Sequence, residues 1–370
     1  MKTLLKKLVR ADSTVEKGEL AAAHIIAGEF ARFGIRAGVQ RWGKNRANVI
    51  ATVNSSGQEG ALLFVCHLDV VPSGSAKWKY PPFGAVEEKG RIWGRGTTDM
   101  KGGMSAAVAS ICEIVRQKAR LRGDIIFFAT AGEETDSCGV TRLLARKNTL
   151  PPLTGIIVPE PTDLKVVTMH RGLLWLKVTT RGKAAHGSTP QLGINAVSLM
   201  KLFMDRLQRH KIPVKPHKLL GECTVSVNTI SGGEAINIIP DRCSIGIDIR
   251  TLPGQDNSSI IKYMQNILTD IKRGNPGFEA EIAAVRDSAA LNTDKNCKFV
   301  KDVCSVAGAA GTGAIGFTTD GPYFAGTGAP IVVLGPGESG LCHKPDEYIR
   351  IKDLEKAARC YEKIILKVLT

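Results

Sequence analysis

Acidic residues and histidines gather in three short stretches of this 370-residue chain: HLDVV at 67–71, GRGTTDMKGG at 94–103 and AGEETDSCG at 131–139. Each stretch places metal-type ligands where an apolar run gives way to a loop. Histidine nitrogen and carboxylate oxygen together suit zinc or a neighbouring metal, and a pair of glutamates can give one carboxylate to a metal while the other serves as a base. The pattern predicts metal-assisted hydrolysis.

The first stretch offers one ligand and one supporting carboxylate. His67 and Asp69 lie two residues apart after the run LLFVC, and in an extended chain such side chains point to the same face. His67 can therefore bind a metal through one ring nitrogen while Asp69 accepts a hydrogen bond from the other and fixes the tautomer. The alternative is a surface motif that binds no metal.

Three further carboxylates follow in the next two stretches. Asp99 lies in a glycine-rich loop, where unusual backbone conformations are easily adopted, and its two oxygens could bridge two ions; a simple turn is the alternative. Glu133 and Glu134 directly follow the apolar run DIIFFATAG, and adjacent carboxylates repel unless a cation or solvent neutralises them. We expect Glu134 to bind a metal and Glu133 to take the proton of a metal-bound water; an exposed acidic loop is the alternative.

Two more candidate ligands complete the set. Glu160 ends the apolar run of IIVPEPTD, and His343 follows the run IVVLG and a glycine-rich loop. All five candidate ligands thus come from the carboxyl ends of predicted strands or from the loops beyond them, which is where open α/β sheets place their sites. Their joint occurrence is a stronger indication than any one residue.

The order of predicted elements indicates an α/β fold, because strand-type and helical runs alternate as in chains that build a sheet covered by helices. The run Asp124 to Ala131 is nearly continuous in apolar residues, which is typical of a strand buried on both faces. Strands are expected at 48–53, 61–66, 124–131 and 331–334, and helices at 15–34, 104–115, 297–307 and 351–369.

A different pattern interrupts this fold. The runs between residues 173 and 285 follow the order βαββαβ, the split βαβ arrangement of a small domain. Because the α/β pattern and the ligand-type His343 come after it, we interpret this segment as an insertion. We expect a catalytic domain of residues 1–172 and 286–370 and an inserted domain of residues 173–285.

Composition narrows the setting of the protein. The longest apolar runs are far too short to span a bilayer, and the N-terminus lacks the apolar stretch of a secretory leader, so we expect a cytoplasmic protein without a membrane partner. Nine cysteines without paired spacing fit reduced thiols. The net charge of +15 is dispersed and aromatic content is only 5%, which weakens any stacking platform for nucleic acid. We expect no nucleic-acid partner.

Taken together, these segments make the chain resemble the M20 family of dinuclear metallopeptidases and amidohydrolases, which includes acetylornithine deacetylase, succinyl-diaminopimelate desuccinylase, aminoacylase and glutamate carboxypeptidase. The resemblance implies a zinc-peptidase-like catalytic domain with a mixed central sheet and an inserted ferredoxin-like lid and dimerisation domain. The stretches that carry it occur in the family's order: HLDVVP, GRGTTDMKGG, AGEET, PEPTD, GKAAHGSTP and CHKPDEY.

The resemblance also implies a ligand set. Two zinc ions, which cobalt could replace, would be bridged by Asp99 and by a water or hydroxide. One ion would take His67 and Glu160 as its further ligands, and the other would take Glu134 and His343.

Catalytic roles follow from the same resemblance. Asp69 would orient His67, and Glu133 would be the general base that later passes the proton to the leaving amine. The peptide bond between Asp99 and Met100 would be cis.

The inserted domain would supply further site residues. His186 in GKAAHGSTP corresponds to a histidine that stabilises the oxyanion, often across a dimer, so a homodimer through the lid is expected. Arg250 and Asn237 match lid residues that hold the substrate carboxylate, and Arg171 is a further candidate. Because guanidinium binds carboxylate through paired hydrogen bonds, Arg250 is the first choice for a substrate acid group.

The substrate remains open between an N-acyl amino acid and a short peptide. The segment GPGESGLCHKPDEYI looks more like acetylornithine deacetylases of amino-acid biosynthesis, whereas TTDGPYF looks closer to desuccinylases and carboxypeptidases. We expect hydrolysis of an N-acyl amino acid by a metal-bridging hydroxide, with a di- or tripeptidase or carboxypeptidase as the alternative. Two hypotheses of another class are a catalytically silent metal-binding partner and a basic nucleic-acid-associated protein.

Overall fold

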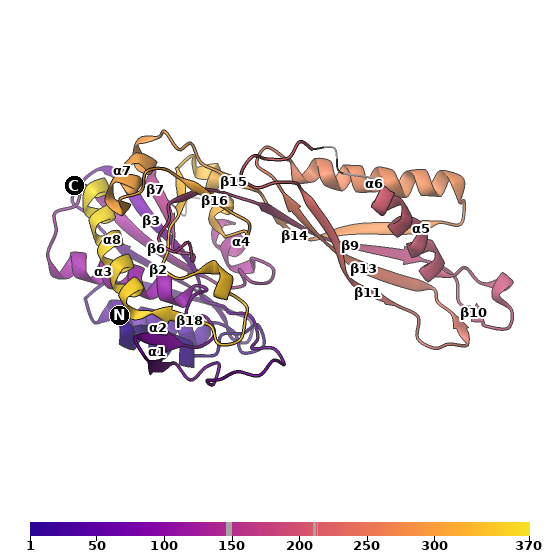
Figure 1. The fold of residues 1–370 in the computed structure, drawn as a ribbon, viewed down its shortest axis with the longest axis horizontal. Helices are drawn as coiled ribbons and strands as arrows, with labels where there is room; N and C mark the ends of the chain where they lie inside the picture. Colours follow the sequence, from indigo (N-terminus) through magenta and orange to yellow (C-terminus); the bar gives the residue numbers. More distant parts are fainter. Residues whose placement is uncertain (146–149, 210–211, 213) are drawn as a thin grey trace. The chain divides into compact units, whose positions relative to one another are not determined.

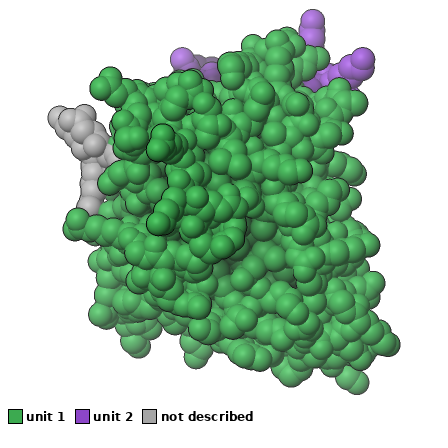
Figure 2. Space-filling view, turned by 90° about the vertical axis from the view of Figure 1, so that its left-hand side faces the viewer, with its two compact units in different colours: residues 1–169, 291–315, 319–370 green, residues 170–290, 316–318 purple. Residues whose placement is uncertain are grey.

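The computed structural model describes residues 1–145, 150–209, 212 and 214–370. The chain divides into two compact units, both drawn in Figure 1. Unit 1 consists of residues 1–169, 291–315 and 319–370, and unit 2 of residues 170–290 and 316–318, coloured green and purple in Figure 2. Among the described helices, none has both the length and the apolar character needed to cross a membrane.

A mixed nine-stranded sheet forms the centre of unit 1. Its strand order is β1-β2-β6-β3-β7-β17-β8-β15, and β16 pairs with β8. The four central strands β6, β3, β7 and β17 are mutually parallel, whereas β1, β2 and β8 join antiparallel. The strands are β1 (Ala37–Trp42), β2 (Arg46–Val53), β3 (Glu59–His67), β6 (Gly123–Thr130), β7 (Leu153–Val158), β8 (Val167–His170), β15 (Leu291–Asn292), β16 (Gly313–Ile315) and β17 (Ile331–Val333).

The central strands alternate their side chains between two apolar cores, one on each face of the sheet. In β3, Phe64 and Cys66 belong to the core under the helices α3 and α8, whereas Leu63 and Val65 belong to the core on the opposite face. Figure 1 shows α3, α7 and α8 along the first face and α4 on the other side. The helices are α1 (Lys2–Arg10), α2 (Leu20–Ala31), α3 (Lys101–Arg116), α4 (Cys138–Leu144), α7 (Lys298–Ala307), α8 (Ile351–Leu369), η2 (Gly321–Thr327) and η3 (Ser339–Leu341).

The N-terminal part differs from the helix expected at residues 15–34. The structure has α2 over Leu20–Ala31 and places a separate helix, α1, before it. Leu4, Leu5 and Leu8 of α1 are buried, because their spacing puts them on one face of the helix.

A second, three-stranded sheet of unit 1 supports the loops beyond the main sheet. Its order is β18-β5-β4. Trp93 of β5 contacts Tyr80 and Tyr348, with ring centroids 5.1 Å and 4.7 Å away. The strands are β4 (Val86–Glu88), β5 (Arg91–Trp93) and β18 (Tyr348–Arg350).

Unit 2 is a four-stranded antiparallel sheet covered on one face by two helices, as Figure 1 shows. Met200 and Phe203 of α5 and Met264 of α6 pack against alternate residues of the sheet, such as Leu176 and Ile247. Its chain order, β9-α5-β11-β13-α6-β14, is βαββαβ, and its sheet order is β11-β13-β9-β14. The elements are β9 (Gly172–Arg181), β10 (Ala185–His186), η1 (Pro190–Leu192), α5 (Ala196–Arg209), β11 (Thr224–Gly232), β12 (Ile238–Ile239), β13 (Arg242–Thr251), α6 (Asn257–Gly274) and β14 (Glu279–Ser288).

Candidate metal centre

The two carboxylate oxygens of Asp99 each face a histidine in unit 1. Oδ1 lies 3.1 Å from His67 Nε2, and Oδ2 lies 3.2 Å from His343 Nε2. Each histidine also meets a glutamate: His67 Nε2 is 3.4 Å from Glu160 Oε1, and His343 Nε2 is 3.0 Å from Glu134 Oε1. Asp99 therefore stands between two histidine–glutamate pairs, one on each of its oxygens.

The strand order explains how these distant residues meet. His67 ends β3, and Glu134 and Glu160 follow the neighbouring parallel strands β6 and β7. Parallel strands end at the same edge of a sheet, which is where such folds bind their ligands. Asp99 and His343 reach this edge from the loops before α3 and β18, and the His343 backbone has φ of +63°, a conformation uncommon outside glycine.

The hydrogen bond at the far side of the His67 ring prepares its inner nitrogen for a cation. Nδ1–H donates to the backbone carbonyl of Asp69 at 3.0 Å, and a carbonyl can only accept. In the neutral ring Nε2 is then unprotonated and turns its lone pair toward the carboxylates of Asp99 and Glu160. A cation between these groups would make that contact favourable, as a metal ligand requires.

The carboxylates of the cluster lie so close together that a positive charge among them is favourable, and the raised pKa values of the cluster reflect this. Burial, reinforced by the charge of Asp99, raises the pKa of Glu134 and of Glu160 to about 8. Hydrogen bonds with Asp99 and Glu134 raise the pKa of His343 to about 10. Ligand atoms of His67, Asp99 and Glu134 lie within 4.8 Å of one another. Imidazole and carboxylate in this proportion fit zinc.

Asp69 supports the turn that carries the two glutamates. Its Oδ1 accepts from the backbone N–H of Glu133 at 3.1 Å, and its Oδ2 accepts from that of Glu134 at 2.9 Å. The expected hydrogen bond between the Asp69 carboxylate and the His67 ring is not the one formed, since Oδ1 lies 3.7 Å from Nδ1. The backbone carbonyl of Asp69 takes that place because the carboxylate is occupied by the two amides.

The peptide bond between Asp99 and Met100 is cis, as the family resemblance implies. Met100 Sδ accepts from the backbone N–H of His67 at 3.1 Å. The next residue, Lys101, is wholly buried and donates to two backbone carbonyls at the end of α1, at 2.9 Å and 3.0 Å. Burial lowers the pKa of Lys101 to about 7. Met100 and Lys101, the two residues after Asp99, are thus both held by hydrogen bonds.

Two glycines allow close approaches of the backbone beside the candidate ligands. A Cβ at Gly103 in α3 would lie 1.9 Å from the backbone oxygen of Pro159, the residue before Glu160. Gly132 precedes the glutamate pair with φ of +78°, and a Cβ there would meet Asp136 Oδ1 at 2.6 Å. Larger residues would therefore displace the backbone that carries Glu160 or the glutamate turn.

Comparison with known proteins identifies the family. Residues 63–367 match the family model described as peptidase family M20/M25/M40. The chain belongs to the M20 family. A probable succinyl-diaminopimelate desuccinylase of Staphylococcus aureus is 30% identical to this M20 chain over 376 residues, which cover 92% of the chain and 90% of the relative. An acetylornithine deacetylase of Myxococcus xanthus is 29% identical over 364 residues, covering 96% and 93%.

Solved structures show the same fold as this M20 chain. An M20 family metallo-carboxypeptidase from Sulfolobus solfataricus matches with a TM-score of 0.81 at 21% identity, covering 99% of this chain and 98% of the other. A dinuclear metal-binding M20 peptidase from Bacillus subtilis matches with a TM-score of 0.71 at 15% identity, covering 100% and 98%. The mixed α/β fold with a central mixed sheet that the sequence predicts is confirmed, and the protein is an enzyme of the metal-dependent amidohydrolase and metallopeptidase class.

Two residues that the sequence predicts to contact substrate, His186 and Asn237, lie together on a short ribbon of unit 2. His186 in β10 pairs with Ile238 in β12, next to Asn237, whose carbonyl accepts from Gly187 N–H at 2.7 Å. Nδ1 of the exposed His186 accepts from the backbone N–H of Ser188 at 3.1 Å. In the neutral ring the proton is therefore on Nε2, which can donate to a ligand.

The two candidate arginines lie elsewhere in unit 2. Arg250 forms an ion pair with Asp248, with Nε 2.8 Å from Oδ1 and Nη2 3.0 Å from Oδ2. Arg171 donates to the backbone carbonyls of Leu220 and Glu222, the latter at 2.6 Å. Arg250 keeps about a third of its side chain exposed, whereas Arg171 is engaged with backbone.

Sequence reasoning missed three buried charged residues beside the centre, namely Arg95, Lys101 and Glu347. Each lies within a stretch that carried a candidate ligand, since Arg95 and Lys101 belong to GRGTTDMKGG and Glu347 to CHKPDEY. Charged residues of these types are rarely buried without a partner. Their presence inside stretches of candidate ligands was the signal that could have indicated a supporting role.

Proposed function

We propose that this M20 enzyme hydrolyses the amide bond of an N-acyl amino acid with two zinc ions, for which cobalt could substitute, held at the candidate metal centre. The observation that carries the proposal is Asp99, whose two oxygens each face one histidine–glutamate pair. When bound, two such ions would polarise an amide carbonyl and lower the pKa of a water. His67 and Glu160 would hold one ion, and His343 and Glu134 the other.

Glu133 is proposed as the general base. It is buried and directly precedes the candidate ligand Glu134, and the backbone N–H groups of both glutamates donate to Asp69. Glu133 would take a proton from the attacking water and pass it to the leaving amine. Asp69 would act by holding the backbone N–H of Glu133 and thereby the direction of its side chain.

Unit 2 would supply the substrate contacts. Arg250 would hold the carboxylate of the amino-acid product, because its fork is rigid, partly exposed and already oriented by Asp248. His186 would donate through Nε2 to the developing oxyanion, with Asn237 beside it. Arg171 would hold the turn at Leu220 through its contacts with backbone carbonyls. It could bind a substrate carboxylate only after these contacts open.

The positions of Arg250 and His186 at opposite ends of the unit 2 sheet support a homodimer. Arg250 pairs with Leu173 at one end of the β9–β13 ladder, and Arg242 pairs with Arg181 at the other end, next to the ribbon of His186. The eight steps along β13 correspond to roughly 27 Å at about 3.4 Å per residue. Arg250 and His186 of one chain therefore lie too far apart to hold one small substrate, and we propose that His186 acts in the partner's site.

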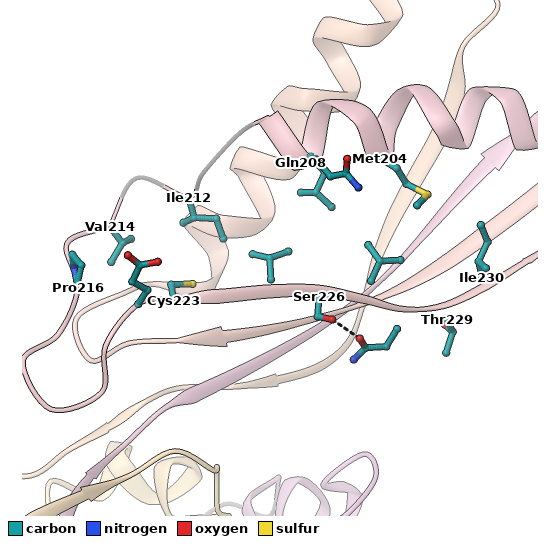
Figure 3. A pocket seen from close by; sticks show the side chains of 14 residues that line it. Met204, Gln208, Ile212, Val214, Pro216, Cys223, Ser226, Thr229 and Ile230 are labelled. Carbon is teal, nitrogen blue, oxygen red and sulfur yellow. Dashed lines mark hydrogen bonds between the residues drawn. The ribbon is translucent and has the colours of Figure 1, made fainter.

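β11 is the proposed dimer surface. It is an edge strand of the unit 2 sheet with all nine residues exposed, and an exposed edge strand is a template for pairing. A groove of about 760 Å³ runs beside it, where Figure 3 shows Met204 of α5 facing the strand that carries Ser226 and Ile230. Antiparallel pairing of β11 with β11 of a second copy would form a two-fold interface.

The dimer proposal is tested by Val227→Lys, which places a charge on the β11 edge, against Val285→Lys on the opposite edge strand β14 as the matched control. Light scattering should report dimers for wild type and Val285→Lys and monomers for Val227→Lys. Mixing inactive His186→Ala with inactive Glu133→Gln chains should restore activity, because a mixed dimer contains one complete site. Monomeric wild type, or no recovery on mixing, would contradict the proposal.

A deacylase is the favoured activity, since the named relatives at 30% and 29% identity are a probable desuccinylase and a deacetylase that match along nearly their whole length. A peptidase is the alternative, supported by the carboxypeptidase with the same fold. Amide hydrolysis by zinc-loaded enzyme should be measured on N-succinyl and N-acetyl amino acids and on dipeptides, with Glu133→Gln as control. Turnover of one acyl class, lost in Glu133→Gln, would name the substrate; turnover of dipeptides alone would favour the peptidase.

A further inference from the structure

A wholly buried ion pair joins the loops that carry the candidate ligands. Glu347 is 0% exposed and Arg95 is 2% exposed, and Arg95 Nη1 lies 2.8 Å from Glu347 Oε2. Removing two charges from water costs free energy that their attraction offsets only when further hydrogen bonds satisfy both groups. The partners of this pair therefore indicate what it does.

The Glu347 carboxylate binds the backbone of the loop that ends in Asp99. Oε1 accepts from the N–H of Thr98 at 2.8 Å and from the N–H of Asp99 itself at 3.2 Å. Oε2 accepts from the N–H of Gly96 at 3.1 Å, beside the contact with Arg95. One carboxylate thus fixes three amides of this loop, including that of the bridging ligand.

Arg95 extends the connection to two more loops. Its Nη1 also donates to the carbonyl of Lys344, the residue after His343, at 3.2 Å, and its Nη2 donates to the carbonyl of Pro72 at 3.4 Å. The guanidinium carbon lies 5.0 Å from the ring centroid of Trp78. Arg95 therefore contacts the loop of His343 and the loop that follows His67 and Asp69.

We infer that Arg95 and Glu347 are positioning residues for the metal centre, which set the spacing of the loops that carry Asp99, His343 and His67 and thereby the affinity for both ions. The inference rests on the proposed dinuclear centre. The pair binds the amide of Asp99 and the carbonyl next to His343. Contacts at these two places are not needed for general stability, but they would position both candidate ligands. Hydrogen bonds of this kind orient ligands and tune the metal.

Glu347→Gln tests the inference with little change in size. The side-chain amide would present an N–H₂ group to one of the backbone N–H groups that the carboxylate now accepts from, so the Asp99 loop must shift. Zinc affinity, measured by competition with a chromogenic chelator, should fall about 10- to 100-fold. The zinc concentration that gives half-maximal turnover should rise by the same factor.

Glu19→Gln is the matched control. Glu19 is also 0% exposed and pairs with an arginine, Arg46, at 2.8 Å, but it accepts no hydrogen bond from the loops of Asp99 or His343 among the contacts of the described chain. Its variant should lower thermal stability while zinc affinity stays close to that of wild type. Arg95→Lys is the second test, and it is decisive if Glu347→Gln does not fold. One ammonium cannot reach Glu347, Lys344 and Pro72 together, so Arg95→Lys should weaken zinc binding.

The outcomes separate this inference from the proposed function. Wild-type protein that binds no zinc would overturn the dinuclear centre itself. Wild type that binds zinc, with unchanged affinity in Glu347→Gln or Arg95→Lys, would overturn the positioning role alone. An equal loss of zinc affinity in Glu19→Gln would also overturn it, because any buried ion pair would then have the same effect.

Discussion

The backbone N–H of Glu133 donates to the carboxylate of Asp69 at 3.1 Å. The second oxygen of Asp69 accepts from Glu134 N–H at 2.9 Å, so one buried side chain holds the proposed base and a proposed ligand in fixed relation. Because this contact fixes the backbone of Glu133, it limits the directions that the Glu133 side chain can take.

Asp69→Asn should therefore lower activity without removing the metals. The amide group would turn an N–H₂ toward Glu133 or Glu134, and we expect kcat/KM to fall about 10- to 100-fold, as for other residues that orient ligands. Steady-state kinetics at saturating zinc, together with the zinc content of the variant, measures the effect. Unchanged kcat/KM would show that the Asp69 contacts do not position the base.

Gly103→Ala should damage the protein far more than a helical glycine substitution normally does. The new Cβ would lie 1.9 Å from the backbone oxygen of Pro159, so α3 or the segment of Glu160 must move, at a cost of about 1–3 kcal/mol in unfolding free energy. Gly28→Ala in α2 is the control, since it meets nothing within 4 Å and should stabilise the helix by about 1 kcal/mol. Thermal denaturation of both variants decides; a Gly103→Ala as stable as wild type would refute the close approach.

His170 should make stability depend on pH. Burial lowers the pKa of His170 from its ordinary 6.5 to about 4, so between these values the unfolded chain binds a proton that the folded chain does not. The contribution of the neutral His170 to the free energy of unfolding is fully present above pH 6.5. It is lost as pH falls toward 4, by about 1.4 kcal/mol per pH unit. Urea unfolding of wild type and His170→Gln should give the steeper loss in wild type, and identical pH profiles would exclude a buried neutral histidine.

The clustering of the candidate ligands could be predicted from sequence because local patterns determine where these residues lie. Continuous apolar runs such as that of β6 indicate strands buried on both faces, and a polar residue directly after such a run lies at the carboxyl edge of the sheet. His67, Glu134 and Glu160 follow such runs, and the structure brings them into one cluster. The βαββαβ order of unit 2 was equally visible, since each of its elements has a clear period.

Contacts between distant segments could not be predicted in the same way. Glu347 and the amide of Asp99 are 248 residues apart in sequence, and no periodicity connects them. The error at Asp69 has a similar origin. The two-residue spacing puts its side chain on the face of His67, but the competing backbone amides of Glu133 and Glu134 come from the turn after another strand, β6. Helix α1 was missed although the spacing of Leu4, Leu5 and Leu8 indicates an amphipathic helix.

The central claim is that the two oxygens of Asp99 serve two metal ions, and calorimetric titration of metal-free protein with zinc tests it most directly. Because each oxygen faces its own histidine–glutamate pair, wild type should bind two zinc ions per chain, and Asp99→Asn should lose affinity for both. A wild-type chain that binds one ion or none, or an Asp99→Asn chain that binds two with wild-type affinity, would contradict the account.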